Sequence, residues 1–166
     1  MLFLLAALLL LPSCSLRRPD GPLVQEEPPY PGRTSIHVAD PGIVAQLLRG
    51  WHSVEQESWR WTEKHFAVAL KVPSPGKPAT LQLDLVLPNP LIAKLGAITL
   101  TAAINGATLP AQTFTKPGPH LYAQNVPPAA VNAEVVRIDF LLDKALPPNN
   151  IDNRELGVVV SSVGLH

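Results

Sequence analysis

Residues with the chemistry to bind a polar ligand gather in one short stretch, residues 50–62, which also holds all three tryptophans of the chain. An indole ring offers a flat face on which a sugar ring can stack. Trp51, His52, Glu55 and Arg60 combine such a ring with side chains that hydrogen-bond hydroxyl groups. We therefore take these four as candidate ligand-binding residues of a non-catalytic site.

Arg154 is a fifth candidate, from a second polar stretch at residues 152–157. Such a stretch could line a calcium site, or it could hydrogen-bond a sugar through Arg154. The alternative is a turn in which Asp152 accepts backbone amides and Arg154 pairs with a nearby acid. We favour the turn, because the acid spacing is not that of a calcium loop.

The tryptophans allow two interpretations, a core anchor or a binding face. Each aromatic side chain buries about 150–250 Å², which favours the core in a chain with few aromatics. On a strand, Trp59 and Trp61 point to one side and Arg60 points to the other. We therefore expect Trp59 and Trp61 in the core and Trp51 free to serve a surface.

The sequence gives little indication of catalytic chemistry. The sequence has no glycine-rich phosphate loop, no Gly-x-Ser-x-Gly elbow and no His-Glu-x-x-His helix. Glu55 and Glu57 would share a strand face about 6–7 Å apart, a separation that could suit a glycosidase pair. Neighbouring glutamates are more often a solvated edge, so we expect no catalytic residue, no metal and no cofactor.

The N-terminal residues indicate export. Leu2 to Leu11 is an apolar run without a charge, too short for a membrane-spanning helix of about twenty residues. Leu11, Ser13 and Cys14 match the lipid-attachment box of a bacterial lipoprotein leader, which this segment resembles. Residues 1–14 are therefore expected to be a signal peptide that ends at a lipidated Cys14. An ordinary cleaved signal with an incidental cysteine is the alternative.

The rest of the chain divides into a tether and one domain. Residues 15–33 interleave prolines with glycine and acidic residues, which favours an extended tether. Residues 34–166 are expected to form a β-sandwich domain. The expected location is the bacterial cell envelope, with a membrane anchor through lipid and the domain facing the periplasm or the cell surface.

Composition sets the fold class and excludes one class of partner. Thirteen basic and thirteen acidic residues give a formal net charge of +0, so the sequence lacks the basic footprint of a nucleic-acid binder. Nineteen prolines in 166 residues disfavour a helical bundle. Short strands separated by turns fit better, which predicts an all-β chain.

Period-two patterns place the strands. Apolar and polar residues alternate over residues 80–87, and Asn105-Gly106 predicts a hairpin between residues 96 and 114. Further strands are expected in four ranges: 66–72, 120–124, 134–142 and 157–165. About seven to nine such strands predict an antiparallel β-sandwich or jelly roll. One short helix is expected before the first strand, from Asp40 to Leu48, and ended by Gly50.

Several short motifs resemble a family of small β-sandwich modules appended to bacterial glycosyltransferases and other surface-polysaccharide proteins. The likeness spans about residues 43–165 and is carried by these motifs: Gly50-Trp51, Glu55, Trp59-Arg60-Trp61-Thr62, Asn105-Gly106 and Asp152-x-Arg154-x-Leu156-Gly157. It implies a carbohydrate-binding-like jelly roll without catalytic activity. The expected partner is a glycan or a polysaccharide-biosynthesis protein. A structural or protein-interaction lipoprotein is the alternative, and a glycoside hydrolase is a more distant one.

Overall fold

The structure is a computed structural model, and it describes residues 32–166. The predicted leader with Cys14, and the tether as far as residue 31, lie outside the described residues. The elements in chain order are β1 (Ser35–His37), η1 (Pro41–Gln46), β2 (Leu47–Glu55), β3 (Trp59–Lys71), β4 (Ala79–Leu87), α1 (Asn89–Leu95), β5 (Ile98–Ile104), β6 (Ala107–Thr108), β7 (Gln112–Phe114), β8 (Gly118–Val126), η2 (Pro128–Val131), β9 (Val135–Leu142) and β10 (Val159–Leu165).

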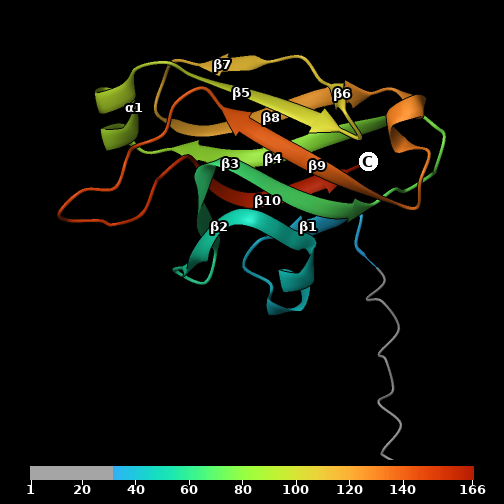
Figure 1. Ribbon diagram of the computed structural model, residues 1–166, viewed down its shortest axis with the longest axis horizontal. Helices are drawn as coiled ribbons and strands as arrows, with labels where there is room; N and C mark the ends of the chain where they lie inside the picture. The colour runs from blue at the N-terminus through green and yellow to red at the C-terminus, as the bar shows by residue number, and fades with distance from the viewer. Residues whose placement is uncertain (1–31) are drawn as a thin grey trace, which may run out of the picture.

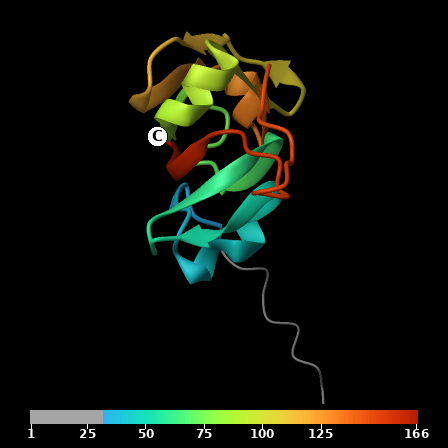
Figure 2. The ribbon, with the colours of Figure 1, turned by 90° about the vertical axis from the view of Figure 1, so that its left-hand side faces the viewer.

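The strands form two packed layers (Figures 1 and 2). One layer has β5 paired with β9, β9 paired with β3, and β3 paired with β2, while β6 and β7 both pair with β5. The other has β8 paired with β4, β4 with β10, and β10 with β1. Every pair is antiparallel. The predicted all-β sandwich is therefore confirmed.

The long strand β3 joins the two layers. Its C-terminal part pairs with β9, and near its start Arg60 and Trp61 pair with Val160 and Val159 of β10. One curled sheet thus closes over a single core. Because β3 runs through both layers, residues near its beginning lie where the two layers meet.

Alternating sequence explains the core. In β4 the buried residues are Leu81, Leu83, Leu85 and Leu87, with exposed or half-buried residues between them. The same alternation in β5 and β9 buries one face of each strand. Phe66 and Phe140 stack inside the core with ring centroids 4.8 Å apart. The predicted Asn-Gly hairpin is also present, because Asn105 and Gly106 have positive φ and connect β5 to β6.

A helix begins at the position that was expected, with Asp40 as its cap, but it is shorter than expected and follows the first strand. The short strand β1 comes first, and the helix that follows is a 3₁₀ helix that ends at Gln46. Asp40 caps it as predicted, with a carboxylate oxygen that accepts the Gly42 N–H at 2.7 Å. Residues 47–55 instead pair with β3, since a long ladder of backbone hydrogen bonds outweighs weak local helix preference.

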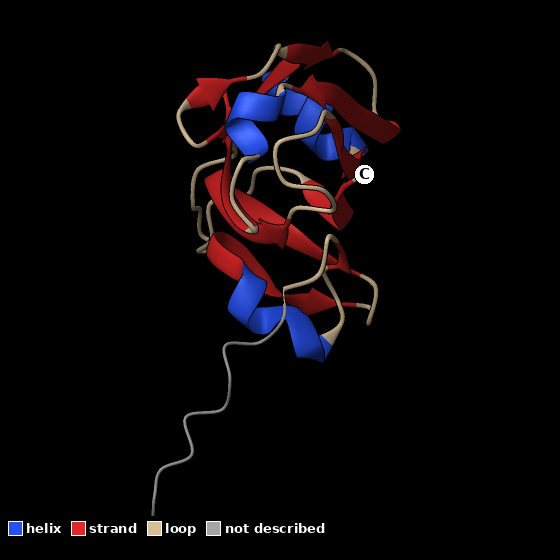
Figure 3. Ribbon diagram, turned by 90° about the vertical axis from the view of Figure 1, so that its right-hand side faces the viewer, coloured by secondary structure: helices blue, strands red, loops and turns tan. Residues whose placement is uncertain are grey.

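A second helix, α1, was not expected. The prolines at positions 88 and 90 had indicated a gap between strands. Both lie at the helix start, where a missing N–H costs nothing, and Gly96 ends the helix with a φ of 70°. Figure 1 shows α1 at one end of the sandwich, and Figure 3 shows another helical segment at the lower end of the strands. In the described part of the chain, no helix is both long enough and apolar enough to cross a membrane.

Candidate functional site

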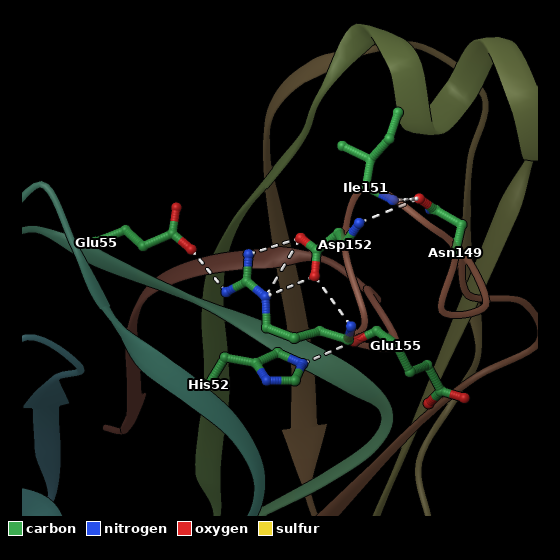
Figure 4. Close-up of polar contacts among 7 residues, drawn as sticks. His52, Glu55, Asn149, Ile151, Asp152 and Glu155 are labelled. Carbon is green, nitrogen blue, oxygen red and sulfur yellow. Dashed lines mark hydrogen bonds and ion pairs between the residues drawn. The ribbon is translucent and has the colours of Figure 1, made fainter.

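Three of the five predicted ligand residues meet at the end of the β2–β3 hairpin. His52 and Glu55 belong to β2, and Arg154 arrives from the loop between β9 and β10. We call these three residues, together with Asp152, the hairpin cluster (Figure 4). The cluster therefore depends on how the loop of residues 143–158 is held against β3.

Backbone contacts fix this loop. A β-bridge pairs Leu146 with Leu156 at its base. Gly157 donates its N–H to the Thr62 carbonyl at 2.6 Å, and Val158 donates its N–H to the Thr62 hydroxyl at 3.1 Å. A side chain at Gly157 would place its Cβ 2.6 Å from the Glu63 carbonyl oxygen, so the approach requires glycine. Arg154 is thus carried on a rigid support.

Arg154 is the centre of the hairpin cluster. Its Nη1 lies 2.8 Å from Glu55 Oε1, although the two residues are 99 positions apart in the sequence. Its Nε and Nη2 donate to the Asp152 carboxylate at 3.0 and 2.9 Å. In Figure 4, Glu55 and Asp152 lie on different sides of one guanidinium group. The side chains of Arg154 and Glu55 are each about one-third exposed, so a ligand can reach both.

Asp152 and Arg154 of this cluster stabilise each other's charged forms. Hydrogen bonds from the Arg154 side chain and from its backbone N–H lower the pKa of Asp152 to about 2. The carboxylates of Asp152 and Glu55 in turn raise the pKa of Arg154. Near neutral pH the site therefore presents a permanent cation bound to an ionised Asp152. The turn interpretation of residues 152–157, in which Asp152 accepts a backbone amide and Arg154 pairs with an acid, is confirmed in its contacts.

His52 belongs to the hairpin cluster but does not bond its charged groups. Its Nε2 lies 2.7 Å from the Glu155 carbonyl oxygen. Since a carbonyl oxygen only accepts, Nε2 must carry the hydrogen of this bond. The Glu155 side chain in turn accepts the Lys64 backbone N–H at 2.7 Å. His52 thus fastens the loop to the β2–β3 hairpin, and its role toward a ligand stays a prediction.

Arg60 lies outside the cluster. Its Nε donates to the Val38 carbonyl at 2.7 Å and its Nη1 to the His52 carbonyl at 2.8 Å. Burial lowers the pKa of the Arg60 guanidinium. These bonds connect the chain after β1 to β2, so Arg60 acts here as a brace between strands. Its contact with a ligand stays a prediction.

The three tryptophans are distributed differently from the expectation. Trp51 packs against the core, stands edge-on to Phe66 at 5.2 Å and donates its indole N–H to the Ala67 carbonyl at 2.9 Å. The expectation that Trp51 stays free for a surface was therefore wrong. Shifts of register along β2 explain the error, because each shift changes the side to which the following residues point.

Trp61 packs against the core as predicted, while Trp59 is the outer member of a ring pair. The two indoles meet edge to face with centroids 6.3 Å apart. Trp59 is half-buried and is the direct cross-strand partner of Glu55. Directly opposite residues have Cβ atoms about 4.5–5.5 Å apart, so the side chain of Trp59 starts next to that of Glu55. Sequence reasoning missed this position, since the pairing depends on the turn that joins β2 to β3.

The proposed Glu55–Glu57 pair does not form. Glu55 ends β2, whereas Glu57 is exposed in the following turn with a φ of 54°. The two residues therefore do not share a strand face, and the expected separation for a carboxylate pair was wrong. Among residues 32–166, no three His, Cys, Asp or Glu side chains are grouped so that they could hold a metal ion.

No family model and no curated protein matches this sequence. Several solved structures have a similar fold. A family GH115 4-O-methyl-α-glucuronidase matches with a TM-score of 0.52 and 9% identity over 81% of this chain and 17% of that chain. A GH26-CBM35 β-(1,4)-mannanase from Podospora anserina matches with a TM-score of 0.47 and 15% identity over 81% and 27%.

Carbohydrate-binding modules are also among the similar structures. A family 35 module from an environmental isolate matches with a TM-score of 0.41 and 14% identity, over 84% of this chain and 89% of that chain. This chain spans only a small part of the two enzymes but nearly all of this module. At such low identities the likeness extends to the β-sandwich fold alone.

Proposed function

We propose that this chain is a non-catalytic glycan-binding module and that the hairpin cluster, together with Trp59, forms its binding surface. The observation that carries the proposal is the ion pair of Glu55 and Arg154 at the strand position that lies directly opposite Trp59. A fixed cation, a carboxylate and an aromatic ring are the groups with which a protein contacts the hydroxyls and the apolar face of a sugar.

The cluster keeps hydrogen-bonding capacity for a ligand. A guanidinium group has five N–H donors, and the bonds to Asp152 and Glu55 occupy one each on Nε, Nη1 and Nη2. One donor on each terminal nitrogen is left to reach a hydroxyl group. Glu55 uses only Oε1 toward Arg154, so Oε2 can accept from a second hydroxyl. A sugar hydroxyl that both donates and accepts matches this pair.

The charges support binding without catalysis. A glycoside hydrolase needs a carboxyl group that remains protonated near neutral pH and can act as general acid. Asp152 has its pKa lowered to about 2, and Glu55 is paired with the Arg154 cation. The hydrogen bonds to Asp152 favour its ionised carboxylate, which accepts hydrogen bonds but does not deliver a proton.

Glycan binding can be tested on an array of bacterial and plant oligosaccharides. We expect binding that Arg154→Lys, Glu55→Gln and Trp59→Ala each weaken by about tenfold or more, which corresponds to about 1.4 kcal/mol. Glu57→Gln is the matched control, because Glu57 is exposed in the same hairpin and lies outside the cluster. Binding that survives all three cluster variants, or no binding to any glycan, would favour a structural or protein-interaction role instead.

We further propose that the chain is an exported envelope lipoprotein whose lipid is attached at Cys14, so that the membrane and a polysaccharide-handling protein are its neighbours. The proposal rests on the apolar run and the box of residues 11–14. Metabolic labelling with a palmitate analogue in a bacterial host tests it. We expect label on the protein and its loss in Cys14→Ser, while an unlabelled protein in the soluble fraction would contradict the anchor.

A further inference from the structure

A groove lies on the outer face of the layer that contains β5, β9 and β3. Its volume is about 400 Å³, within the range of about 300–1,000 Å³ typical of small-ligand sites. We call it the sheet groove. Its lining includes polar side chains from His65, Thr101, Thr108 and Asp139, and apolar ones from Ala103 and Leu141. None of these residues belongs to the hairpin cluster.

Strand register explains why these side chains converge. Leu141 on β9 lies directly between Thr101 on β5 and His65 on β3. Asp139, two residues earlier, therefore points to the same face and has Ala103 as its cross-strand partner. Two neighbouring rows across three strands thus provide a shared floor, with the small residue Ala103 on its β5 side, over which a ligand can settle. Figure 1 shows β5, β9 and β3 side by side.

The backbone of this face is not available to a peptide strand. β9 has partners on both sides, β5 and β3, and β5 has β9 on one side and β6 and β7 on the other. Adding a strand requires an unpaired sheet edge. A ligand in the sheet groove must therefore be recognised by side chains alone, through hydroxyl, imidazole and carboxylate groups above an aliphatic floor.

The charge balance of the sheet groove favours a neutral ligand. Asp139 accepts two hydrogen bonds from Arg137, each 2.7 Å long, and lies 3.1 Å from Nε2 of His65. Its negative charge is thus already compensated by neighbours on the same face. Little net charge is left to attract a strongly ionic ligand.

Leu141 supplies the apolar contact. Its side chain is 50% exposed although the residue is large and hydrophobic, and it lies between the polar side chains of its row. An aliphatic side chain among hydrogen-bonding groups fits a ligand that alternates C–H faces with hydroxyls. Small-ligand sites combine apolar lining with polar groups that fix the orientation of the ligand, and the sheet groove has both.

We propose that the sheet groove is a second binding site, which takes a neutral oligosaccharide chain. The ligand class rests on the proposed glycan-binding function, whereas the site itself is independent of the hairpin cluster. The ring faces of the sugar pack against Leu141 and the alanine floor. Its hydroxyls bond to Asp139, His65 and the hydroxyl groups of Thr101 and Thr108.

Calorimetric titration of the full chain with neutral hexasaccharides of glucose, mannose and xylose tests this site. We expect Leu141→Asp to weaken binding of the recognised hexasaccharide by about tenfold or more, because it places a charge on the apolar floor. Val135→Asp is the matched control, since Val135 lies on the same face of the same strand with the same 50% exposure and does not line the groove. It should change affinity by less than about twofold.

The variants distinguish the failure of one proposed site from the failure of the other. If Glu55→Gln abolishes all binding and Leu141→Asp leaves it unchanged, the sheet groove is overturned and the hairpin cluster stands. If Leu141→Asp removes binding and the cluster variants have no effect, the groove is supported and the hairpin cluster is overturned. Equal losses in Leu141→Asp and Val135→Asp, tighter binding of a hexauronate, or no binding of any neutral hexasaccharide would each overturn the groove. Thermal unfolding of both aspartate variants shows whether they remain folded.

Discussion

At the scale of single residues, the hairpin cluster shows how a charged group can be positioned without being buried. Arg154 and its two carboxylate partners are each about one-third exposed or less, and such surface pairs contribute about 0–1 kcal/mol to stability. The ion pairs of the cluster therefore matter more for the position of Arg154 than for the stability of the fold. Asp152 holds the guanidinium through Nε and Nη2, while Glu55 accepts from Nη1.

The lowered pKa of Asp152 makes a prediction about pH. A depressed carboxylate pKa contributes stability that is present above the unfolded pKa, about 3.9, and is lost as pH falls through the folded pKa of about 2. We expect Asp152→Asn to lower the free energy of unfolding at pH 7. The difference from the wild type should shrink between about pH 4 and pH 2 in urea titrations. A difference that stays constant to pH 2 would contradict the ion pair.

Thr62 provides a second residue-scale prediction. Its buried hydroxyl accepts the Val158 N–H and holds the loop that carries Arg154. We expect Thr62→Val to lower the free energy of unfolding by about 1–3 kcal/mol, because the Val158 amide is left without its partner. Thr62→Ser keeps the hydroxyl and is expected to cost less than Thr62→Val. A smaller loss for Thr62→Val than for Thr62→Ser in chemical denaturation would show that the methyl group, not the hydrogen bond, matters.

At the scale of elements, β2 is the strand whose irregularity decides the site. Its pairing with β3 shifts register three times between Leu47 and Val54. Gly50 has a φ of 71°, and a Cβ there would lie 2.2 Å from the His65 carbonyl oxygen. The close approach that this glycine permits lets Trp51 reach Phe66 and the core. The bulged strand then brings His52 and Glu55 to the loop of Arg154.

Gly50→Ala tests this element. We expect a loss of about 1–2 kcal/mol from the left-handed backbone, and about 1–3 kcal/mol more because β2 and β3 must separate. Gly106→Ala is the matched control, since Gly106 also has a positive φ of 82° but has open space around its Cα. Thermal unfolding should show the larger loss for Gly50→Ala. Similar losses in the two variants would mean that crowding at Gly50 is unimportant.

At the scale of the whole molecule, the two ends of the described chain are joined. β1 pairs with β10, and Ile36 and Val38 are buried in the core although they lie close to the first described residue. Arg33 is also tied to the domain, because its carbonyl accepts the Lys71 N–H and its own N–H bonds to Gln46. The sandwich therefore depends on residues that border the predicted tether.

Truncation tests this dependence. A chain that begins at residue 32 is the reference, because it keeps all the described residues. One that begins at residue 39 should lose about 3–6 kcal/mol, because burial of Ile36 and Val38 contributes about 1.5–3 kcal/mol each. Such a loss is a large share of the roughly 5–15 kcal/mol typical of a domain. Equal stability of the two chains in urea unfolding would contradict the contribution of β1.

Particular elements show where sequence-based prediction succeeds. Alternation in residues 80–87 and 134–142 predicted β4 and β9, since the period of a strand is a local property. The hairpin at Asn105-Gly106 was predicted for the same reason. The start of α1 was missed because prolines at a helix start look the same in sequence as prolines in a loop. His65 and Asp139 of the sheet groove have no local sequence pattern that would predict a binding site.

By itself, the sequence determined the fold class, the positions of most strands and the two polar stretches that hold candidate ligand residues. Only the tertiary structure decided that Trp51 faces the core, that Trp59 lies beside Glu55 and that Arg154 joins Glu55 across 99 positions. The physical reason is that burial of one strand face is encoded by neighbouring residues. Register and loop docking depend on distant ones, and a shift of one residue turns every side chain to the other face.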